Sequence, residues 1–79
     1  MNNAELRAVL ESEGIPGWSY DLDGGSPSEA YVLAEEAGTW SVYYSERGLR
    51  TGERTFPSED AACRHLLESL RNEPSLRKR

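Results

Sequence analysis

Residues 39–56 read Thr-Trp-Ser-Val-Tyr-Tyr-Ser-Glu-Arg-Gly-Leu-Arg-Thr-Gly-Glu-Arg-Thr-Phe, and this stretch decides the fold. Trp40, Val42 and Tyr44 recur at every second position, which is the pattern of a half-buried β-strand. Gly48 suits a left-handed turn position, because it has no side chain to clash there. The residues after this turn are predicted to return as a second strand, so the stretch forms a hairpin at the centre of a small sheet.

A second hairpin is predicted immediately upstream. Residues 29–35 form its first strand, and Glu36-Ala37-Gly38 fits a three-residue loop with Gly38 in the left-handed position. This loop length places Val32 opposite Val42, and a loop one residue different would exchange the two faces of the strand. Under the expected register, the helix-covered face carries Ala30, Val32, Ala34, Trp40, Val42 and Tyr44, and the open face carries Tyr31, Leu33 and Tyr43.

Amphipathic helices are predicted on either side of the strands. Asn2 or Asn3 can cap the first helix, over residues 3–13, and Ser58 can cap the second. A short strand over residues 17–22 is expected after the first helix. The apolar stripes are Leu6, Val9 and Leu10 in the first helix, and Ala62, Cys63, Leu66, Leu67 and Leu70 in the second.

This order predicts a single α+β domain over residues 1–72. It consists of a helix, a three- to four-stranded antiparallel sheet and a second helix, with both helices on one face because each has one apolar stripe. Residues 73–79 are expected to be a flexible basic tail. A chain of 79 residues has a small core, so we expect it to act by presenting a surface rather than by enclosing a substrate.

The charge of the chain is unevenly distributed. The net charge is −5, yet the last three residues are all basic, and residues 1–71 hold thirteen acidic and six basic side chains. Such an acidic body repels nucleic acid and attracts basic surfaces. One cysteine, a polar beginning and no apolar run of about 20 residues favour a cytoplasmic protein that does not enter membranes.

Residue types that carry catalysis are sparse. Cys63 belongs to an apolar stripe and is expected in the core, and His65, the one histidine, is expected on a helix surface. One cysteine and one histidine make no zinc site, and nothing marks a nucleophile with its base. Asp21 and Asp23 are more typical of a solvated loop than of a cation site. We therefore expect no enzymatic activity, no cofactor and no metal.

Binding of duplex nucleic acid is disfavoured by one segment. Double-stranded-RNA-binding domains share the helix–strands–helix order, but their second helix begins with lysines that bind phosphates, whereas residues 58–60 read Ser-Glu-Asp here. An alternative function remains open. Arg47, Arg50 and Arg54 lie beside the aromatic residues of the central hairpin, an arrangement that could stack single-stranded bases in a small regulatory or nucleic-acid-binding domain.

Several segments together resemble a family of small actinobacterial proteins associated with bacterial polymorphic toxin systems. These segments are Trp40-Ser-Val-Tyr-Tyr-Ser-Glu-Arg-Gly48, Phe56 and Ser58-Glu-Asp-Ala-Ala-Cys63, and the similarity extends over residues 17–70. The resemblance implies an immunity protein, a cytoplasmic chain that binds and blocks a cognate toxin domain. Because the matched residues are ones that build the fold, the resemblance transfers no binding residue to this chain.

A partner-binding surface is therefore expected on the open face of the sheet, where aromatic and aliphatic side chains would have an acidic rim. The partner would be a toxin with a basic cleft, and the chain itself a monomer or weak homodimer. The predicted partner-binding residues are Tyr31, Leu33, Tyr43, Glu29, Glu35, Glu53, Asp21 and Asp23. If the two faces are exchanged, the interface moves to Trp40, Tyr44, Arg50 and Arg54.

Overall fold

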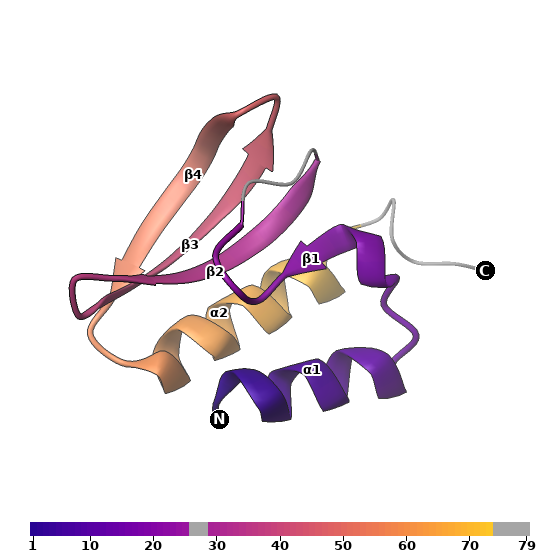
Figure 1. Cartoon of the computed structure of the whole chain (residues 1–79). Coiled ribbons are helices and arrows are strands. Elements are labelled where there is room, and N and C mark those ends of the chain that lie inside the picture. Colours follow the sequence, from indigo (N-terminus) through magenta and orange to yellow (C-terminus); the bar gives the residue numbers. More distant parts are fainter. Residues whose placement is uncertain (26–28, 74–79) are drawn as a thin grey trace.

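The computed structural model describes residues 1–25 and 29–73, and its two helices begin where the sequence signals place them (Figure 1). α1 spans Asn3–Ser12 and starts with a capping box. The Asn2 side chain accepts from the Glu5 backbone N–H at 2.9 Å, and the Glu5 carboxylate accepts from the Asn2 N–H at 3.1 Å. Both bonds satisfy backbone donors that a helix start leaves without partners.

α2 spans Glu59–Arg71 and is capped by Ser58, whose hydroxyl accepts from the Ala61 N–H at 3.2 Å. Glu59 and Asp60 lie in its first turn, where the helix dipole favours negative charge. The two helices pack against each other, and α2 also packs across the sheet. The predicted capping residues of both helices are thus confirmed.

Four strands form one sheet in the order β1-β2-β3-β4. The strands are β1 (Tyr20–Asp21), β2 (Ala30–Glu36), β3 (Thr39–Glu46) and β4 (Leu49–Phe56). The α+β class and the helix–sheet–helix order are confirmed. The sheet is mixed rather than antiparallel, however, because β1 runs parallel to β2.

The first strand is shorter than predicted. Gly17–Ser19 form a short 3-10 helix, η1, instead of extended chain. Its hydrogen bonds explain the difference, because both the N–H and the hydroxyl of Ser19 donate to the Pro16 carbonyl. Proline favours such a turn at this position because its ring fixes φ, which is −61° here.

Both hairpin turns contain two residues, whereas three were expected for the first. Ala37-Gly38 joins β2 to β3, Arg47-Gly48 joins β3 to β4, and all four residues have positive φ, as type I′ turns require. The shorter first turn pairs Leu33, not Val32, with Val42. Since side chains alternate along a strand, this shift exchanges the two faces of β2 relative to the prediction.

The main core lies between the helices and the sheet. Val42 and Leu33 are both buried there, so the prediction that Val42 points inward is confirmed and the placement of Leu33 on an open face is wrong. Trp40 is partly buried against the same core. The buried members of the main core are Leu6, Leu10, Leu22, Leu33, Val42, Ala62, Cys63, Leu66, Leu67 and Leu70.

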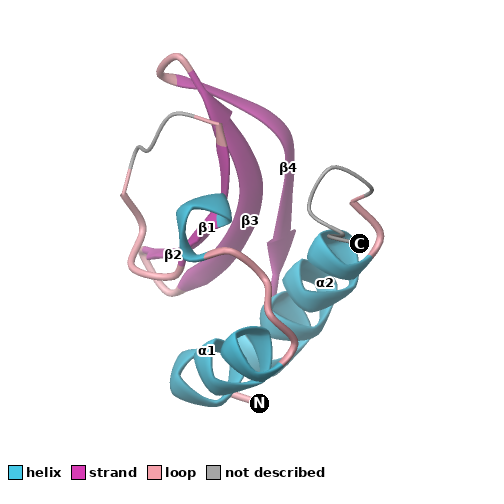
Figure 2. Cartoon of the chain, turned by 90° about the vertical axis from the view of Figure 1, so that its right-hand side faces the viewer, coloured by secondary structure: helices cyan, strands magenta, loops and turns pink. Residues whose placement is uncertain are grey.

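The opposite face of the sheet holds a second, smaller cluster of buried residues: Val32, Ala34 and Tyr43. The described part of the connection between β1 and β2 runs along this side, away from the helices (Figure 2). A Cβ atom built on Gly24 would lie 3.4 Å from the Ala34 Cβ, so this connection is in contact with the sheet. The expected open patch is therefore covered here, and Tyr43 is only 3% exposed.

β4 contains a β-bulge at Gly52. Val42 pairs with Arg54 and Tyr44 pairs with Thr51, so two residues of β4 lie opposite the single residue Tyr43. Gly52 has a φ of +63°, the left-handed geometry that a bulge of this kind places on glycine.

Substituting Gly52 with alanine should lower the free energy of unfolding by about 1–2 kcal/mol, because the left-handed backbone is unfavourable for residues with a Cβ. Space is not the cause, since nothing lies within 4 Å of the added atom. Gly17→Ala is the matched control: it has equal room without the positive φ, and its stability should stay close to that of the wild type. Urea denaturation of both variants checks this, and equal stabilities would contradict the bulge.

Candidate protein-binding surface

Three tyrosines lie side by side on adjacent strands, on the side of the sheet that carries the helices. Tyr20 pairs with Tyr31 across β1 and β2, and Tyr31 pairs with Tyr44 across β2 and β3. We call Tyr20, Tyr31 and Tyr44 the tyrosine row. The rings of Tyr31 and Tyr44 meet edge to face, with centroids 5.0 Å apart. All three side chains are half-buried, so part of each is packed against the protein and part is accessible to solvent.

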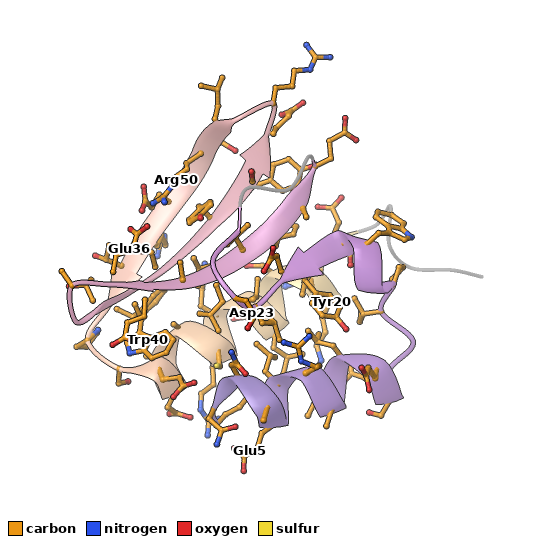
Figure 3. The ribbon with its side chains drawn as sticks, in the orientation of Figure 1. Glu5, Tyr20, Asp23, Glu36, Trp40 and Arg50 are labelled. Carbon is orange, nitrogen blue, oxygen red and sulfur yellow. The ribbon has the colours of Figure 1, made fainter. Side chains whose placement is uncertain are left out.

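The tyrosine row lies toward the end of the sheet opposite the turn between β2 and β3. Tyr31 donates its hydroxyl proton to Glu73 Oε1 at 3.2 Å, and Glu73 comes two residues after the end of α2. Figure 1 shows the ends of β3 and β4 rising past both helices at this end of the sheet. Tyr20 projects from β1 toward the helices (Figure 3). The row therefore extends from the covered part of the sheet to its uncovered end.

Carboxylates surround the tyrosine row, and we call Glu11, Glu29, Glu46 and Glu73 the carboxylate rim. Burial raises the pKa of the Tyr44 phenol, and the charges of Glu29, Glu46 and Glu73 raise it further. For Tyr31 the pKa is raised by burial and then by the hydrogen bond to Glu73. For Tyr20 it is raised by burial and then by Glu11, with Arg7 opposing. The rim thus gives the row a negative potential, which adds to the effect of burial in raising the pKa of its phenols.

The tyrosine pKa values predict a loss of stability at high pH. A phenol whose pKa is higher in the folded state than in the unfolded state holds its proton more tightly when folded. That contribution is complete below the ordinary value of 10.0 and is lost as the pH rises past it. Ultraviolet titration of the phenolates should therefore show later ionisation in the folded protein than in urea, and coincident titration curves would contradict the described surroundings of the row.

Within residues 1–25 and 29–73, two large apolar side chains are strongly exposed, and both lie in elements next to the strands of the row. Trp18, 70% exposed, lies in η1 two residues before Tyr20, and η1 contacts β2 as well as β1. Leu49, 67% exposed, pairs with Glu46, two residues after Tyr44 along β3. A surface that concentrates aromatic and aliphatic side chains within a charged rim has the composition of a protein interface.

On the opposite face of the sheet, one arginine side chain covers the Tyr43 ring. The Arg50 guanidinium lies 4.1 Å from the centroid of the Tyr43 ring and forms ion pairs with Glu36 at 2.7 Å and Glu53 at 3.0 Å. Arg50 and Glu36 come from different strands and point toward each other (Figure 3). The hydrogen bond from Arg50 lowers the pKa of the Glu36 carboxyl. We call these four residues the Arg50 clasp.

Of the predicted binding residues, Tyr31 and Glu29 belong to the tyrosine row and its rim, but Tyr31 lies on the helix side of the sheet and not on the open face as predicted. Leu33 lies in the main core, and the Tyr43 ring lies beneath the Arg50 guanidinium, so neither side chain is exposed as predicted. The cause is the two-residue turn, which exchanged the faces of β2, together with the bulge, which places Glu53 beside Arg50.

The remaining predicted residues lie apart from the row. Glu35 is exposed and pairs with Trp40, near the opposite end of the sheet. Asp21 accepts from the Asp23 N–H at 2.8 Å, and Asp23 forms an ion pair with Arg7 at 3.5 Å. These two aspartates therefore have local partners within the chain, as a turn would give them.

The sequence analysis did not include Tyr20, Tyr44, Trp18 and Leu49 among the residues of the expected partner-binding surface. Tyr44 was named only for the case of exchanged faces, and the turn length is the signal that would have decided between the two cases. Tyr20 depends on a parallel pairing with β2. Such a pairing joins segments separated by a loop and leaves no local pattern in the sequence.

Two kinds of site can be assessed among the described residues, a reactive thiol and a metal cluster. Cys63 is buried, and its pKa is raised to about 11 by burial, so the thiol stays protonated and unreactive. Within residues 1–25 and 29–73, no group of three or more histidine, cysteine, aspartate or glutamate side chains could hold a metal ion. None of the helices in the described part of the chain is long and apolar enough to cross a membrane. The predicted basic tail, apart from residue 73, lies outside the described residues.

Comparisons of the chain with protein-family models, with curated proteins and with solved structures return no match.

Proposed function

We propose that this chain is a non-enzymatic protein-binding module that uses the tyrosine row and its carboxylate rim to bind a basic surface. One observation carries the proposal. Three half-buried tyrosines lie on the adjacent strands β1, β2 and β3, and the large apolar side chains that are most exposed among the described residues, Trp18 and Leu49, lie in the flanking elements η1 and β4. This arrangement supplies large, rigid aromatic area that is already partly ordered before binding.

The charge of the surface favours a cationic partner. The four glutamates of the rim surround the row, and Arg7, the cation near Tyr20, is paired with Asp23. Carboxylates at the edge of an interface attract a basic partner during encounter and make the association sensitive to salt. The tyrosine rings would then contribute the contacts that exclude water.

The specific form that we propose is an immunity protein that binds and occludes a cognate bacterial toxin domain in the cytoplasm. The resemblance of residues 17–70 to small actinobacterial immunity-type proteins supports it, and so does the acidic body of the chain. The partner is then a toxin domain with a basic cleft, and occlusion needs no catalytic residue on this chain. The chain would act as a monomer or weak homodimer.

The alternative of single-stranded nucleic-acid binding receives less support from the side chains. It requires arginines and aromatic rings of the hairpin on one accessible surface. Arg50 is held by Glu36 and Glu53, and Trp40 packs against the main core. Those contacts occupy two of the groups that would contact bases.

Removing two rim charges should weaken partner binding. The double variant Glu29→Gln/Glu46→Gln should reduce affinity for the partner about tenfold, because each rim charge contributes about half of the roughly 1.4 kcal/mol that this factor represents. The matched control is Glu35→Gln/Glu68→Gln, which removes the same charge from exposed positions away from the row.

The measurement uses wild type and both variants as immobilised baits in an extract of the native cell, followed by affinity measurement with the captured protein. We expect wild type and control to retain the same protein and the rim variant to lose most of it. Equal retention by all three baits, or capture of nucleic acid alone, would contradict the proposed function.

A further inference from the structure

The Arg50 clasp shows how this protein accommodates a cation on a tyrosine ring. The ring of Tyr43, in the middle of β3, is covered by the Arg50 guanidinium at 4.1 Å. Carboxylates of Glu36, from β2, and Glu53, from β4, hold the guanidinium in place at 2.7 Å and 3.0 Å. The clasp thus combines a cation–π contact with two charge-assisted hydrogen bonds from one planar group.

A similar set of side chains lies on the helix side of the same strand. Tyr44 is the residue after Tyr43 and therefore points to the other face. Glu46 follows two positions later on the same face, and Glu29 directly precedes β2, whose first residue pairs with Ser45. Glu29 and Glu46 are near enough to act on the Tyr44 phenol. Each face thus has a tyrosine ring of β3 with two glutamates near it: Glu36 of β2 and Glu53 of β4 on one face, and Glu46 of β3 with Glu29, which directly precedes β2, on the other.

The Arg50 clasp contains a cation, whereas the set of Tyr44, Glu29 and Glu46 has none among the described residues. In residues 1–25 and 29–73, the ion pairs place no arginine or lysine on Glu29 or Glu46, and no cation–π contact involves Tyr44. The edge-to-face contact with Tyr31 holds the Tyr44 ring in position. The helix-side set therefore resembles the clasp without its arginine.

We infer that the tyrosine row receives an arginine side chain of the partner, with its guanidinium on the Tyr44 ring between Glu29 and Glu46. This inference rests on the proposed function and specifies the chemistry of the partner. A guanidinium is planar, so it can lie flat on a ring while its N–H groups donate sideways to two carboxylates. A lysine ammonium is a compact, strongly hydrated charge that cannot present the same flat face. Arginine is the side chain that fits both parts of the set.

Two labelled peptides test the preference. Each has about eight residues with three cationic side chains separated by glycine and serine, and the cations are arginine in one and lysine in the other, so the charge is matched. Fluorescence anisotropy at low salt should give an affinity about tenfold higher for the arginine peptide. Tyr44→Leu should remove that advantage, whereas Tyr44→Phe should keep it because the ring remains.

The outcomes separate this inference from the function on which it rests. Equal affinities for the two peptides, both weakened by Glu29→Gln/Glu46→Gln, would overturn the arginine preference and leave a basic partner in place. Arginine-peptide binding that Tyr44→Leu does not weaken, or no binding of either peptide, would also overturn it. Circular dichroism of each variant shows that the fold is intact. The proposed function itself fails only in the extract experiment above.

Discussion

Replacing Leu33 with alanine should lower the free energy of unfolding by about 2–5 kcal/mol, the range found for large-to-small changes in a tightly packed core. Leu33 has no exposed surface, pairs with Val42 and packs in the main core beneath the helices. The total stability of a small domain is roughly 5 kcal/mol, so this variant should be largely unfolded near body temperature. Thermal and urea denaturation measure the loss.

Leu49→Ala is the matched control for that experiment. It makes the same chemical change in the same sheet, but Leu49 is 67% exposed, so its stability should stay within about 0.5 kcal/mol of the wild type. The comparison also tests the register. If Leu33→Ala were as stable as Leu49→Ala, the turn between β2 and β3 would have a different length and Leu33 would lie on the other face.

Tyr43→Ala should also destabilise the protein, by about 3 kcal/mol or more, because it removes a large buried ring. Tyr43 is 3% exposed and is the largest member of the second cluster, beside Val32 and Ala34. The substitution also removes the surface on which Arg50 stacks. Loss of the ring therefore loosens the covered face of the sheet and the Arg50 clasp together.

The neighbouring Tyr44→Ala variant gives the contrast. Tyr44 is half-buried on the helix side, so Tyr44→Ala should remain folded under conditions in which Tyr43→Ala is unfolded, and it should bind the partner more weakly. Denaturation curves and partner affinity of the two variants check this. A folded Tyr43→Ala that loses partner binding would instead place the interface on the opposite face.

The helices and the fold class could be predicted because their signals are local. Asn2, Glu5 and Ser58 satisfy backbone donors within three residues of themselves, so their roles are readable from spacing alone. The apolar stripe of α2 is similarly local, and all five of its predicted members are buried. Two amphipathic helices around alternating segments leave few arrangements other than helices packed on a sheet.

The faces of β2 could not be decided in the same way, because they depend on one residue of turn length. Both turns have glycine only in their second position, and Ala37 and Arg47 occupy the first with positive φ. A sequence signal for a two-residue turn is asparagine or aspartate before glycine, and neither turn has it. The tertiary packing of Leu33 beneath the helices outweighs the strain that this geometry imposes on Ala37.

The tyrosine row was harder still to predict, because it is made by pairing between distant segments. Tyr20, Tyr31 and Tyr44 become neighbours only through the register of three strands, one of them parallel. Trp18 was expected to alternate within a strand, but the hydrogen bonds of Ser19 to Pro16 turn the chain there and leave the indole exposed. The predicted surface and the tyrosine row share Tyr31 and Glu29, but they lie on opposite faces of the sheet.

The most direct test of the tyrosine row as the binding surface is the NMR spectrum of the tyrosine rings during titration with the captured partner. The sequence has four tyrosines, so their ring signals can be assigned individually by substitution to phenylalanine. The signals of Tyr31 and Tyr44 should shift strongly on binding, while that of Tyr43, buried beneath Arg50 on the other face, should stay in place. Shifts confined to Tyr43, with Tyr31 and Tyr44 unmoved, would contradict this assignment of the surface.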